Sequence, residues 1–425
     1  MSLSRFRYGF RTLILEFKFK NMKKRFIGLT FFLISMLAFC QKTNPELTKY
    51  VNFLEKQNVS AKDYVLDLFK KYDIVILCER NHNEATQYEL ITDIAKDKYF
   101  KKKVGNICME IGVSNLEPEI NKFLTTDNLS TKEIIDKSTF FQRNVPFYAL
   151  WEANSYQKFL ISIYNLNNNS KYKILLHPSD IDFKWSEIKD GNDYKNYLVT
   201  KKNIIKRDSI LASHMINYYE AINKKHKKTL IIINYRHAFK ENMPYSKGIQ
   251  DNAANYIFKK YGNRVANVMI NSINNSTNEL LQNGNWDASF YISKLNNIGF
   301  NFENSPFGND NFDYWNFKNN FNYKDIFTGF VFYKPIEEHK MVSNIPNFIT
   351  DDFQKEFFRR WEITGTLFPN FKKIDLTNTE LVKKIIEDFN TVKETKYYKV
   401  EKLLEQRNKV LNNQEISNFK PQISN

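Results

Sequence analysis

The feature that most constrains the fold is a series of short, continuously apolar segments, each of which ends in polar or ionisable residues. They fall at residues 73–79, 104–112, 171–180, 229–237, 264–273 and 327–336. A strand with one solvated face alternates apolar and polar residues, whereas a continuous apolar run indicates a strand that is covered on both faces. The series therefore predicts a central, mainly parallel β-sheet.

The segments between these runs have helical periodicity. Residues 84–98 and 151–166 are amphipathic, and residues 202–224 place apolar side chains at helical spacing within a charged stretch. Strands that alternate with helices are typical of an α/β fold in which crossover helices flank the sheet. A longer helical insertion is expected at residues 113–150.

Three regions are expected along the 425 residues. Residues 1–40 are upstream residues and an export signal, residues 41–275 form the α/β core, and residues 276–425 are a C-terminal elaboration that packs on the core. Within the elaboration, the stretch 276–350 is rich in Asn, Phe and Gly and lacks periodicity, which indicates irregular structure, and the remainder is helical. A hydrophobic fraction of 42% supports a packed core.

The N-terminal region has the layout of a secretory signal. Met22-Lys-Lys-Arg25 is basic, residues 26–39 are apolar, and Ala38 and Cys40 are the small residues before a cleavage site. The apolar run is short for a membrane span. We expect synthesis to start at Met22 and the mature chain to be periplasmic or secreted. The alternative is an anchor at the cell envelope through a lipid on Cys40.

The charge of the chain argues against one class of partner, and the positions of its cysteines indicate the state of its thiols. The net charge is +16, of which +7 lies in residues 1–40, and no dense Lys/Arg block lies beside exposed aromatic residues, so no nucleic-acid partner is expected. Cys78 and Cys108 lie inside apolar runs, which predicts buried thiols, with a disulfide as the alternative.

Ionisable side chains end four of the predicted strands. They are Glu79 with the following His82, Glu110, His177 with Asp180, and His237. The carboxyl ends of parallel strands meet at one edge of a sheet, where α/β proteins bind ligands. Carboxylates beside histidines at that edge can activate a water molecule, or hold a divalent metal that does so. Taken singly, Glu79 and Asp180 are more readily explained as caps of a helix or a turn, and it is the set of residues together that indicates a site.

Glu110 is the hardest of these residues to explain structurally. It lies within the apolar run Ile-Cys-Met-Glu-Ile-Gly, and buried acids are rarely unpaired. Arg207, followed by Asp208, supplies a guanidinium that can pair with Glu79 or Glu110 or clamp an anionic substrate. The alternative is a pair of charges on a helix surface.

Several common motifs are absent from the sequence. It contains no His-Glu-x-x-His, no Gly-x-Ser-x-Gly, no phosphate-binding loop and no Gly-x-Gly-x-x-Gly. This argues against common zinc proteases, serine hydrolases, nucleotide hydrolases and dinucleotide-dependent enzymes.

Over residues 70–275 the chain resembles the erythromycin esterase-like superfamily, which includes haem-binding ChaN-like lipoproteins and TIKI/TraB proteins. The motifs that carry the resemblance are Glu79-Arg-Asn-His82, Met109-Glu110, Lys206-Arg207-Asp208 and Asn234-Tyr-Arg-His237-Ala238. Two positions depart from the family pattern. Cys78 replaces a glycine, and Asn234 stands where the esterases have another histidine.

The resemblance implies hydrolysis by an activated water. His82 would be the base, with Glu79 and Glu110 orienting it or binding a divalent metal, and Arg207 and His237 would bind substrate or stabilise an oxyanion. Asp180 and Asp208 are expected to contact substrate. If the hydrolysis depends on a metal, the expected ligands are Glu79, His82, Glu110 and His237.

The function expected from the sequence is an exported hydrolase that cleaves an ester, lactone or amide of a small molecule or peptide. The alternative is a non-catalytic haem or small-ligand carrier of the ChaN-like type.

Overall fold

The computed structural model describes residues 45–418 except 148–153, 202, 204, 224–226, 246–247, 316–319, 369–370, 372 and 398. The expected export signal, with Met22 and Cys40, lies outside the described residues. The chain divides into two compact units, Lys49–Val410 and a second that joins Met1–Thr48 to Leu411–Asn425. The sheet and the candidate site belong to Lys49–Val410. None of the described helices combines the length and apolar character needed to cross a bilayer.

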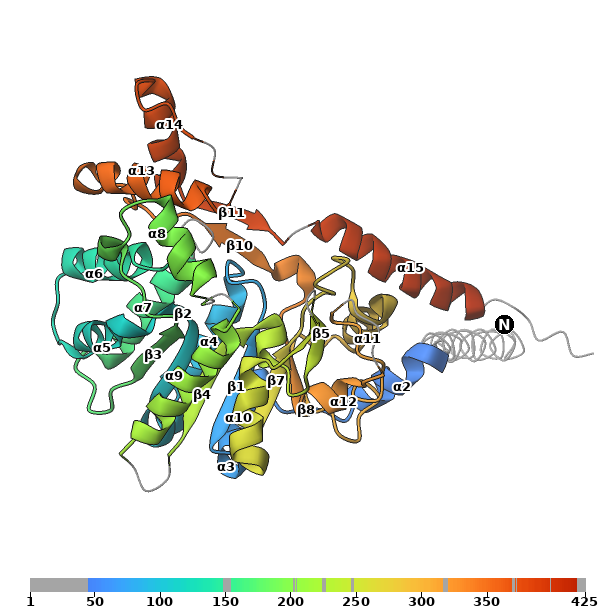
Figure 1. The fold of residues 1–425 in the computed structure, drawn as a ribbon. Coiled ribbons are helices and arrows are strands. Elements are labelled where there is room, and N and C mark those ends of the chain that lie inside the picture. The colour runs from blue at the N-terminus through green and yellow to red at the C-terminus, as the bar shows by residue number, and fades with distance from the viewer. Residues whose placement is uncertain are drawn as a thin grey trace, which may run out of the picture. The chain divides into compact units, whose positions relative to one another are not determined.

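The predicted mainly parallel sheet is confirmed (Figure 1). It has seven strands in the order β3-β2-β4-β1-β7-β9-β8, all parallel except β8, which runs antiparallel to β9. Their bounds are β1 Ile74–Glu79, β2 Asn106–Val113, β3 Leu175–Asp180, β4 Thr229–Asn234, β7 Val265–Ile270, β8 Asn297–Asn301 and β9 Gly329–Tyr333. Strands β1, β2, β4 and β7 are buried at every position, as their continuous apolar runs predict.

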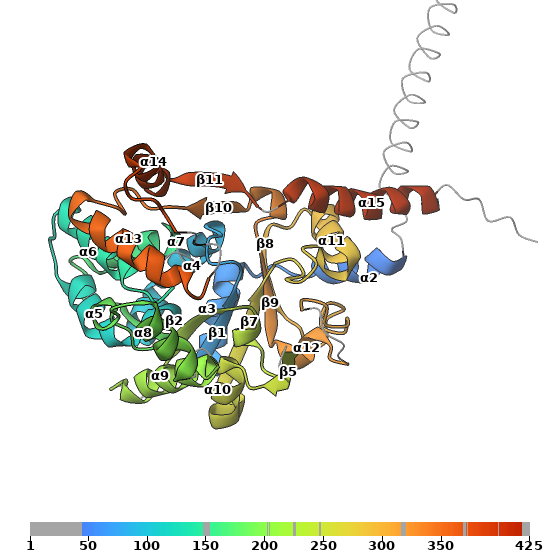
Figure 2. The same cartoon turned by 45° about the horizontal axis from the view of Figure 1, so that its top comes forward.

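Helices cover both faces of this sheet, so the fold is α/β. Helices α3, α4, α5 and α7 share one apolar core with the sheet, and α9 and α10 lie on the opposite face (Figures 1 and 2). The bounds of the helices are α2 Pro45–Leu54, α3 Ala61–Lys71, α4 Thr86–Lys96, α5 Glu117–Thr125, α6 Thr131–Arg143, α7 Asn154–Asn167, α8 Gly191–Lys195, α9 Arg207–Ala221, α10 Ala253–Tyr261, α11 Asn285–Ser293, α12 Tyr323–Ile326, α13 Asp351–Gly365, α14 Thr379–Asn390 and α15 Val400–Asn418.

The helical insertion expected at residues 113–150 contains α5 and α6. Helix α6 begins at a capping box, in which Ser130 and Glu133 satisfy each other's backbone N–H groups. The expectation of irregular structure at residues 276–350 is wrong in part, because this stretch supplies α11 and the strand β8 of the main sheet, whereas β9 falls in the apolar run predicted at residues 327–336. Residues beyond 275 thus complete the sheet as well as packing on it.

Two short hairpins lie outside the main sheet. One pairs β5 (Met243–Tyr245) with β6 (Gly248–Gln250), and the other pairs β10 (Lys340–Ser343) with β11 (Lys393–Lys396). The second hairpin brings the C-terminal part next to the loop that follows β1, because the N–H of Val342 donates to the carbonyl of Asn83.

An irregularity in β2 lies at the functional end of the sheet. The pairing of β2 with β3 shifts register between Met109 and Val113, and Gly112 within this bulge has φ +98°. A Cβ atom on Gly112 would also come within 2.8 Å of Pro178 and Tyr156. The bulge therefore needs glycine at this position, and it re-aims the neighbouring Glu110.

The packing of β8 and β9 against α3 yields a stability prediction. A Cβ atom on Gly329 would overlap the hydroxyl group of Tyr64, which donates to Asn301 at 2.8 Å. We expect Gly329→Ala to lower the free energy of unfolding by about 1–3 kcal/mol, measured by chemical denaturation. Tyr64→Phe removes the nearest of the overlapped atoms, so the double variant should lose less than the sum of the two single variants. Additive losses would contradict this packing.

Candidate functional site

The candidate site lies at the carboxyl edge of the sheet, where the predicted side chains are brought together. Glu79 is the last residue of β1, Glu110 lies in the bulge of β2, and His237 lies in a 3-10 turn directly after β4. Their neighbours Arg207 and Asp208 open α9. Strand order explains the meeting, because β4 lies between β1 and β2.

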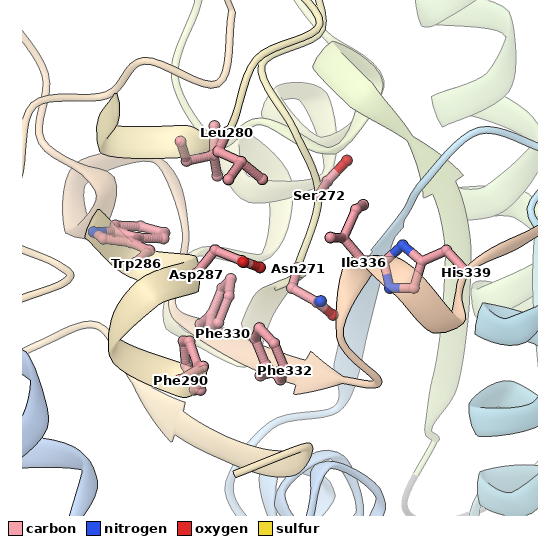
Figure 3. A pocket seen from close by; sticks show the side chains of 11 residues that line it. Asn271, Ser272, Leu280, Trp286, Asp287, Phe290, Phe330, Phe332, Ile336 and His339 are labelled. Atoms are coloured by element: carbon pink, nitrogen blue, oxygen red, sulfur yellow. The ribbon is translucent and has the colours of Figure 1, made fainter. Parts of the chain in front are cut away.

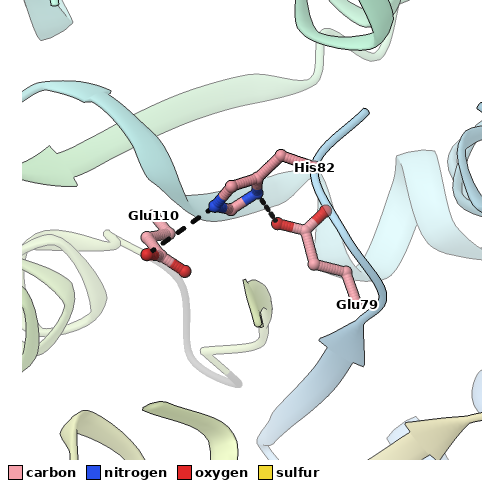
Figure 4. Close-up of side chains that lie close together, drawn as sticks. All are labelled: Glu79, His82 and Glu110. Carbon is pink, nitrogen blue, oxygen red and sulfur yellow. Dashed lines mark hydrogen bonds and ion pairs between the residues drawn. The ribbon is translucent and has the colours of Figure 1, made fainter. Parts of the chain in front are cut away.

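Glu79 and His82 form a carboxylate–imidazole pair (Figure 4). His82 Nδ1 donates to Glu79 Oε1 at 2.7 Å, and the other oxygen of Glu79 accepts from the Tyr88 hydroxyl group at 3.0 Å. With its proton on Nδ1, the neutral ring leaves a lone pair on Nε2, and the side-chain amide of Asn234 lies 3.1 Å from that atom. Glu79 therefore fixes both the tautomer and the orientation of His82.

Asp208 and His237 form a second pair of the same kind. His237 Nδ1 lies 2.5 Å from Asp208 Oδ1, and Asp208 also accepts from Arg236 at 2.6 Å and from the N–H of Ala253 at 3.0 Å. Burial raises the pKa of Asp208, but His237 and Arg236 outweigh that effect and hold it well below its usual range. Asp208 is therefore a carboxylate that orients His237.

Both imidazoles face the same carboxylate, Glu110. Its Oε1 lies 3.8 Å from Nε2 of His82 and 3.7 Å from Nε2 of His237. Burial raises the pKa of Glu110, but His237, Arg207 and His82 together with the N–H of Asn234, which donates at 3.0 Å, lower it to about 2. Glu110 is therefore ionised at neutral pH although it is only 2% exposed.

Arg207 links Glu110 to the end of β3. Its Nη2 donates to Glu110 Oε1 at 3.1 Å, and its Nε and Nη2 bind the two oxygens of Asp180 at 2.8 and 3.2 Å. The sequence leaves open a pair with Glu79 or Glu110, a clamp on an anionic substrate, or a pair of charges on a helix surface. The structure shows a buried pair with Glu110 and not a pair on a helix surface. Asp180 and Asp208 lie behind Arg207 and His237, with their oxygens occupied by these side chains.

The backbone after β4 is bent to bring Asn234 and His237 to the same side. Tyr235 has φ +44°, a conformation that is costly for a bulky residue. The 3-10 turn of residues 235–238 follows at once. The backbone N–H of Asn234 and the ring of His237 consequently both approach Glu110.

Sequence reasoning missed three residues of this site. Tyr88 binds Glu79 but sits at a helical core position, Arg236 binds Asp208 but is flanked by more conspicuous residues, and Asn234 was noted only as a departure from the family pattern. A polar residue at the end of an apolar strand was the available signal for Asn234. The other two depend on contacts between distant segments.

His177, which ends a predicted strand, lies away from this site, held between Glu117 at 3.0 Å and Asn106 at 3.1 Å. Cys78 and Cys108 are buried free thiols, as predicted. Burial raises the pKa of Cys108 to about 12, so this thiol is un-ionised at neutral pH.

A mononuclear metal held by Glu79, His82 and Glu110 fits this geometry poorly. One potential ligand atom from each lies within 4.8 Å of the others, but the two glutamates approach opposite nitrogens of one imidazole ring (Figure 4). The two nitrogens of an imidazole point away from each other, so the two nitrogens of His82 cannot bind the same ion. The other possible set of ligands is His82 Nε2, His237 Nε2 and Glu110. The Arg207 guanidinium lies 3.1 Å from the Glu110 carboxylate, and its positive charge disfavours a metal cation there.

Haem fits the two histidines no better. An axial ligand must direct its nitrogen at the iron, whereas Nε2 of each ring faces the ionised, buried Glu110. The three residues of Figure 4 are better described as a row of carboxylate, imidazole and carboxylate.

A separate small cavity lies in the C-terminal part of the sheet (Figure 3). Its volume is about 30 Å³, and Asn271, Asp287 and His339 are its most polar lining residues. This volume admits water-sized molecules and excludes a substrate of several heavy atoms. Burial raises the pKa of Asp287 to about 6, against the opposing charge of Arg407.

The lowered pKa of Glu110 makes the folded protein acid-sensitive. A carboxylate with a pKa near 2 when folded and an ordinary value of 4.5 stabilises the fold above pH 4.5, and this contribution is lost as the pH falls toward 2. It amounts to about 3 kcal/mol at most. We expect the free energy of unfolding to fall less steeply over this range in Glu110→Gln than in the unaltered protein. Parallel pH profiles would contradict this.

Comparison with known proteins gives likenesses of structure alone. Neither the models of protein families nor the curated protein sequences match this chain. Similar solved structures include a succinoglycan biosynthesis protein, with 10% identity, TM-score 0.47, and coverage of 68% of this chain and 97% of that one. A Bacillus cereus protein has 12% identity, TM-score 0.41, and coverage of 67% and 96%. A mutant erythromycin esterase in its open conformation has 11% identity, TM-score 0.43, and coverage of 68% and 96%. At this identity the likeness assigns no activity to the chain.

Proposed function

We propose that this chain is an exported hydrolase that uses His82 to activate a water molecule and cleave an ester, lactone or amide of a small molecule or peptide. The observation that carries the proposal is the convergence of two carboxylate-oriented imidazoles on Glu110, at 3.8 and 3.7 Å. A structural ion pair needs one partner for a buried carboxylate. Two oriented histidines and an arginine around a single carboxylate are an arrangement suited to proton transfer.

His82 has the properties of the general base. Glu79 holds its proton on Nδ1, so Nε2 is the atom that can accept a proton. The gap of 3.8 Å between Nε2 and Glu110 is too long for a direct hydrogen bond and short enough for one water to contact both. In the proposed step the water oxygen attacks the carbonyl carbon while its proton passes to Nε2.

Arg207 and His237 are placed to act on the other side of the reaction. Attack produces an oxyanion, and both a guanidinium and a protonated imidazole stabilise such a charge by donating hydrogen bonds. When the bond to the leaving oxygen or nitrogen breaks, that atom takes up a proton, and the imidazolium of His82 or His237 can supply it. Asp180 and Asp208 orient these two donors.

The exposure of the side chains supports this division of roles. The side chains of His82, Arg207 and His237 are 12%, 13% and 14% exposed, whereas those of Glu79 and Glu110 are 1% and 2% exposed. The groups assigned to contact substrate thus border the surface, and the carboxylates that orient them lie beneath. A carboxylate that is screened from water acts more strongly on its partner.

Substitution tests the assignment directly. We expect His82→Gln and Glu110→Gln to lower kcat by roughly 1,000-fold or more, because one removes the proton acceptor and the other the central charge. A substrate is first found by screening ester, lactone and peptide libraries. Each library is screened once with a chelator and once with added divalent metals, and we expect the same rate of hydrolysis under the two conditions. His177→Gln is the matched control, since it alters a histidine beside a carboxylate away from the site. Full activity in folded His82→Gln would refute the role of base.

The pH dependence gives a second test. Burial lowers the pKa of His82, but Glu79 and then Glu110 outweigh that effect, so its pKa lies above the ordinary value of 6.5. A general base works when unprotonated, so activity should rise with pH along a limb centred above 6.5. Glu79→Gln removes the main group that raises this pKa, and the limb should move to lower pH. A limb that stays in place would show that another group controls it.

A further inference from the structure

Arg80 lies between Glu79 and His82 in the sequence and has no role in the hydrolysis described above. Its side chain is 0% exposed, which is rare for an arginine. It sits in the loop that joins β1 to α4, and this loop also carries His82. The cost of burying a guanidinium calls for an explanation in terms of what it binds.

All five N–H donors of the guanidinium have acceptors, and these come from three separate parts of the chain. Nε and Nη2 bind the carbonyl and side-chain oxygens of Asn271 just after β7, both at 2.6 Å. Nη2 also binds the carbonyl of Tyr333 at the end of β9, at 2.6 Å. Nη1 binds Glu84 at 2.8 Å and Thr86 at 3.1 Å, where α4 begins. Arg80 therefore ties its own loop to the ends of two neighbouring strands.

Glu84 extends this network to the C-terminal part. Its carboxylate accepts from the N–H groups of Thr86 at 2.9 Å, Gln87 at 3.0 Å and Lys340 at 3.2 Å. Burial raises the pKa of Glu84, but the charge of Arg80 together with hydrogen bonds from Thr86 and Arg80 lowers it to about 2. The carbonyl of Lys340 in turn accepts from the N–H of Ala85 at 2.8 Å. The loop is thus fixed against β10 as well as β9.

Two neutral side chains complete the network. Gln87, which is 0% exposed, accepts from the N–H of Arg80 at 2.6 Å and donates to the carbonyl of Asn81 at 2.8 Å. His339 lines the cavity of Figure 3 beside Asn271, and burial together with the charge of Arg80 lowers its pKa to about 3. His339 is therefore neutral and adds no second positive charge beside Arg80.

We propose that Arg80 is a positioning residue, which holds the loop of residues 80–86 so that the His82 ring reaches both Glu79 and Glu110. Residues 333–343 of the C-terminal part supply the fixed side of this clamp. The significance for catalysis rests on the proposed function, but the positioning of His82 does not.

The test uses Arg80→Lys in the full chain, which keeps the charge beside Glu84 but cannot supply the planar fork to Asn271 and Tyr333. The readout is the low-field proton NMR signal of the His82 Nδ1–H, assigned by its absence in Glu79→Gln. We expect this signal to broaden or shift upfield in Arg80→Lys. If a hydrolysed substrate has been found, kcat should fall roughly 10- to 100-fold while KM changes little.

A second variant guards against simple misfolding. Arg80→Gln removes the charge and the fork but leaves Glu84 with its three backbone N–H donors, and its His82 signal should change in the same way. Arg360→Lys is the control, because Arg360 is also buried but binds Glu356 and the carbonyl of Arg143. An unchanged His82 signal in both folded Arg80 variants overturns the proposal. A changed signal in a protein that hydrolyses nothing keeps the positioning role and refutes the proposed function instead.

Discussion

The structure depends on an ionised carboxylate, Glu110, that has been withdrawn from water. Moving such a group into the interior costs several kcal/mol unless charges and hydrogen bonds replace its hydration. Here they come from Arg207 at the start of α9, from the N–H of Asn234 in β4 and, whenever the rings are protonated, from the imidazoliums of His82 in the loop after β1 and His237 in the turn after β4. Four separate segments must therefore be in place before Glu110 is stable as an anion.

That requirement accounts for the irregular features at this edge of the sheet. The bulge of β2 with Gly112 at φ +98° re-aims Glu110, and Tyr235 at φ +44° lets Asn234 and His237 approach it from one strand end. The buried Arg80 holds the loop that presents His82. Each feature carries a local cost that a regular strand end would avoid. Costs of this kind cluster at functional sites, where a particular side-chain geometry matters more than local stability.

The sheet could be predicted because its strands are buried on both faces, and burial leaves continuous apolar runs such as 74–78 and 229–233 in the sequence. The site's principal residues could be predicted for a related reason, since Glu79 and His237 interrupt or end such runs. Strand β8 could not be predicted from the sequence. It contains Gly299, which makes room for Tyr64, and this contact joins segments more than 200 residues apart. The hydrogen bonds of Arg80 with Asn271 and Tyr333 could not be predicted either, because they also join segments that are distant in the sequence.

The most direct test of the account is the protonation of the two imidazoles, measured by nitrogen-15 NMR of histidine side chains in the neutral form. With Nδ1 of each ring bound to a carboxylate, both His82 and His237 should carry the proton of the neutral ring on Nδ1, which leaves Nε2 unprotonated. Glu79→Gln should disturb the first ring and Asp208→Asn the second. A proton on Nε2 of His82 in the neutral ring would contradict the central claim, because the atom assigned to accept a proton from water would already hold one.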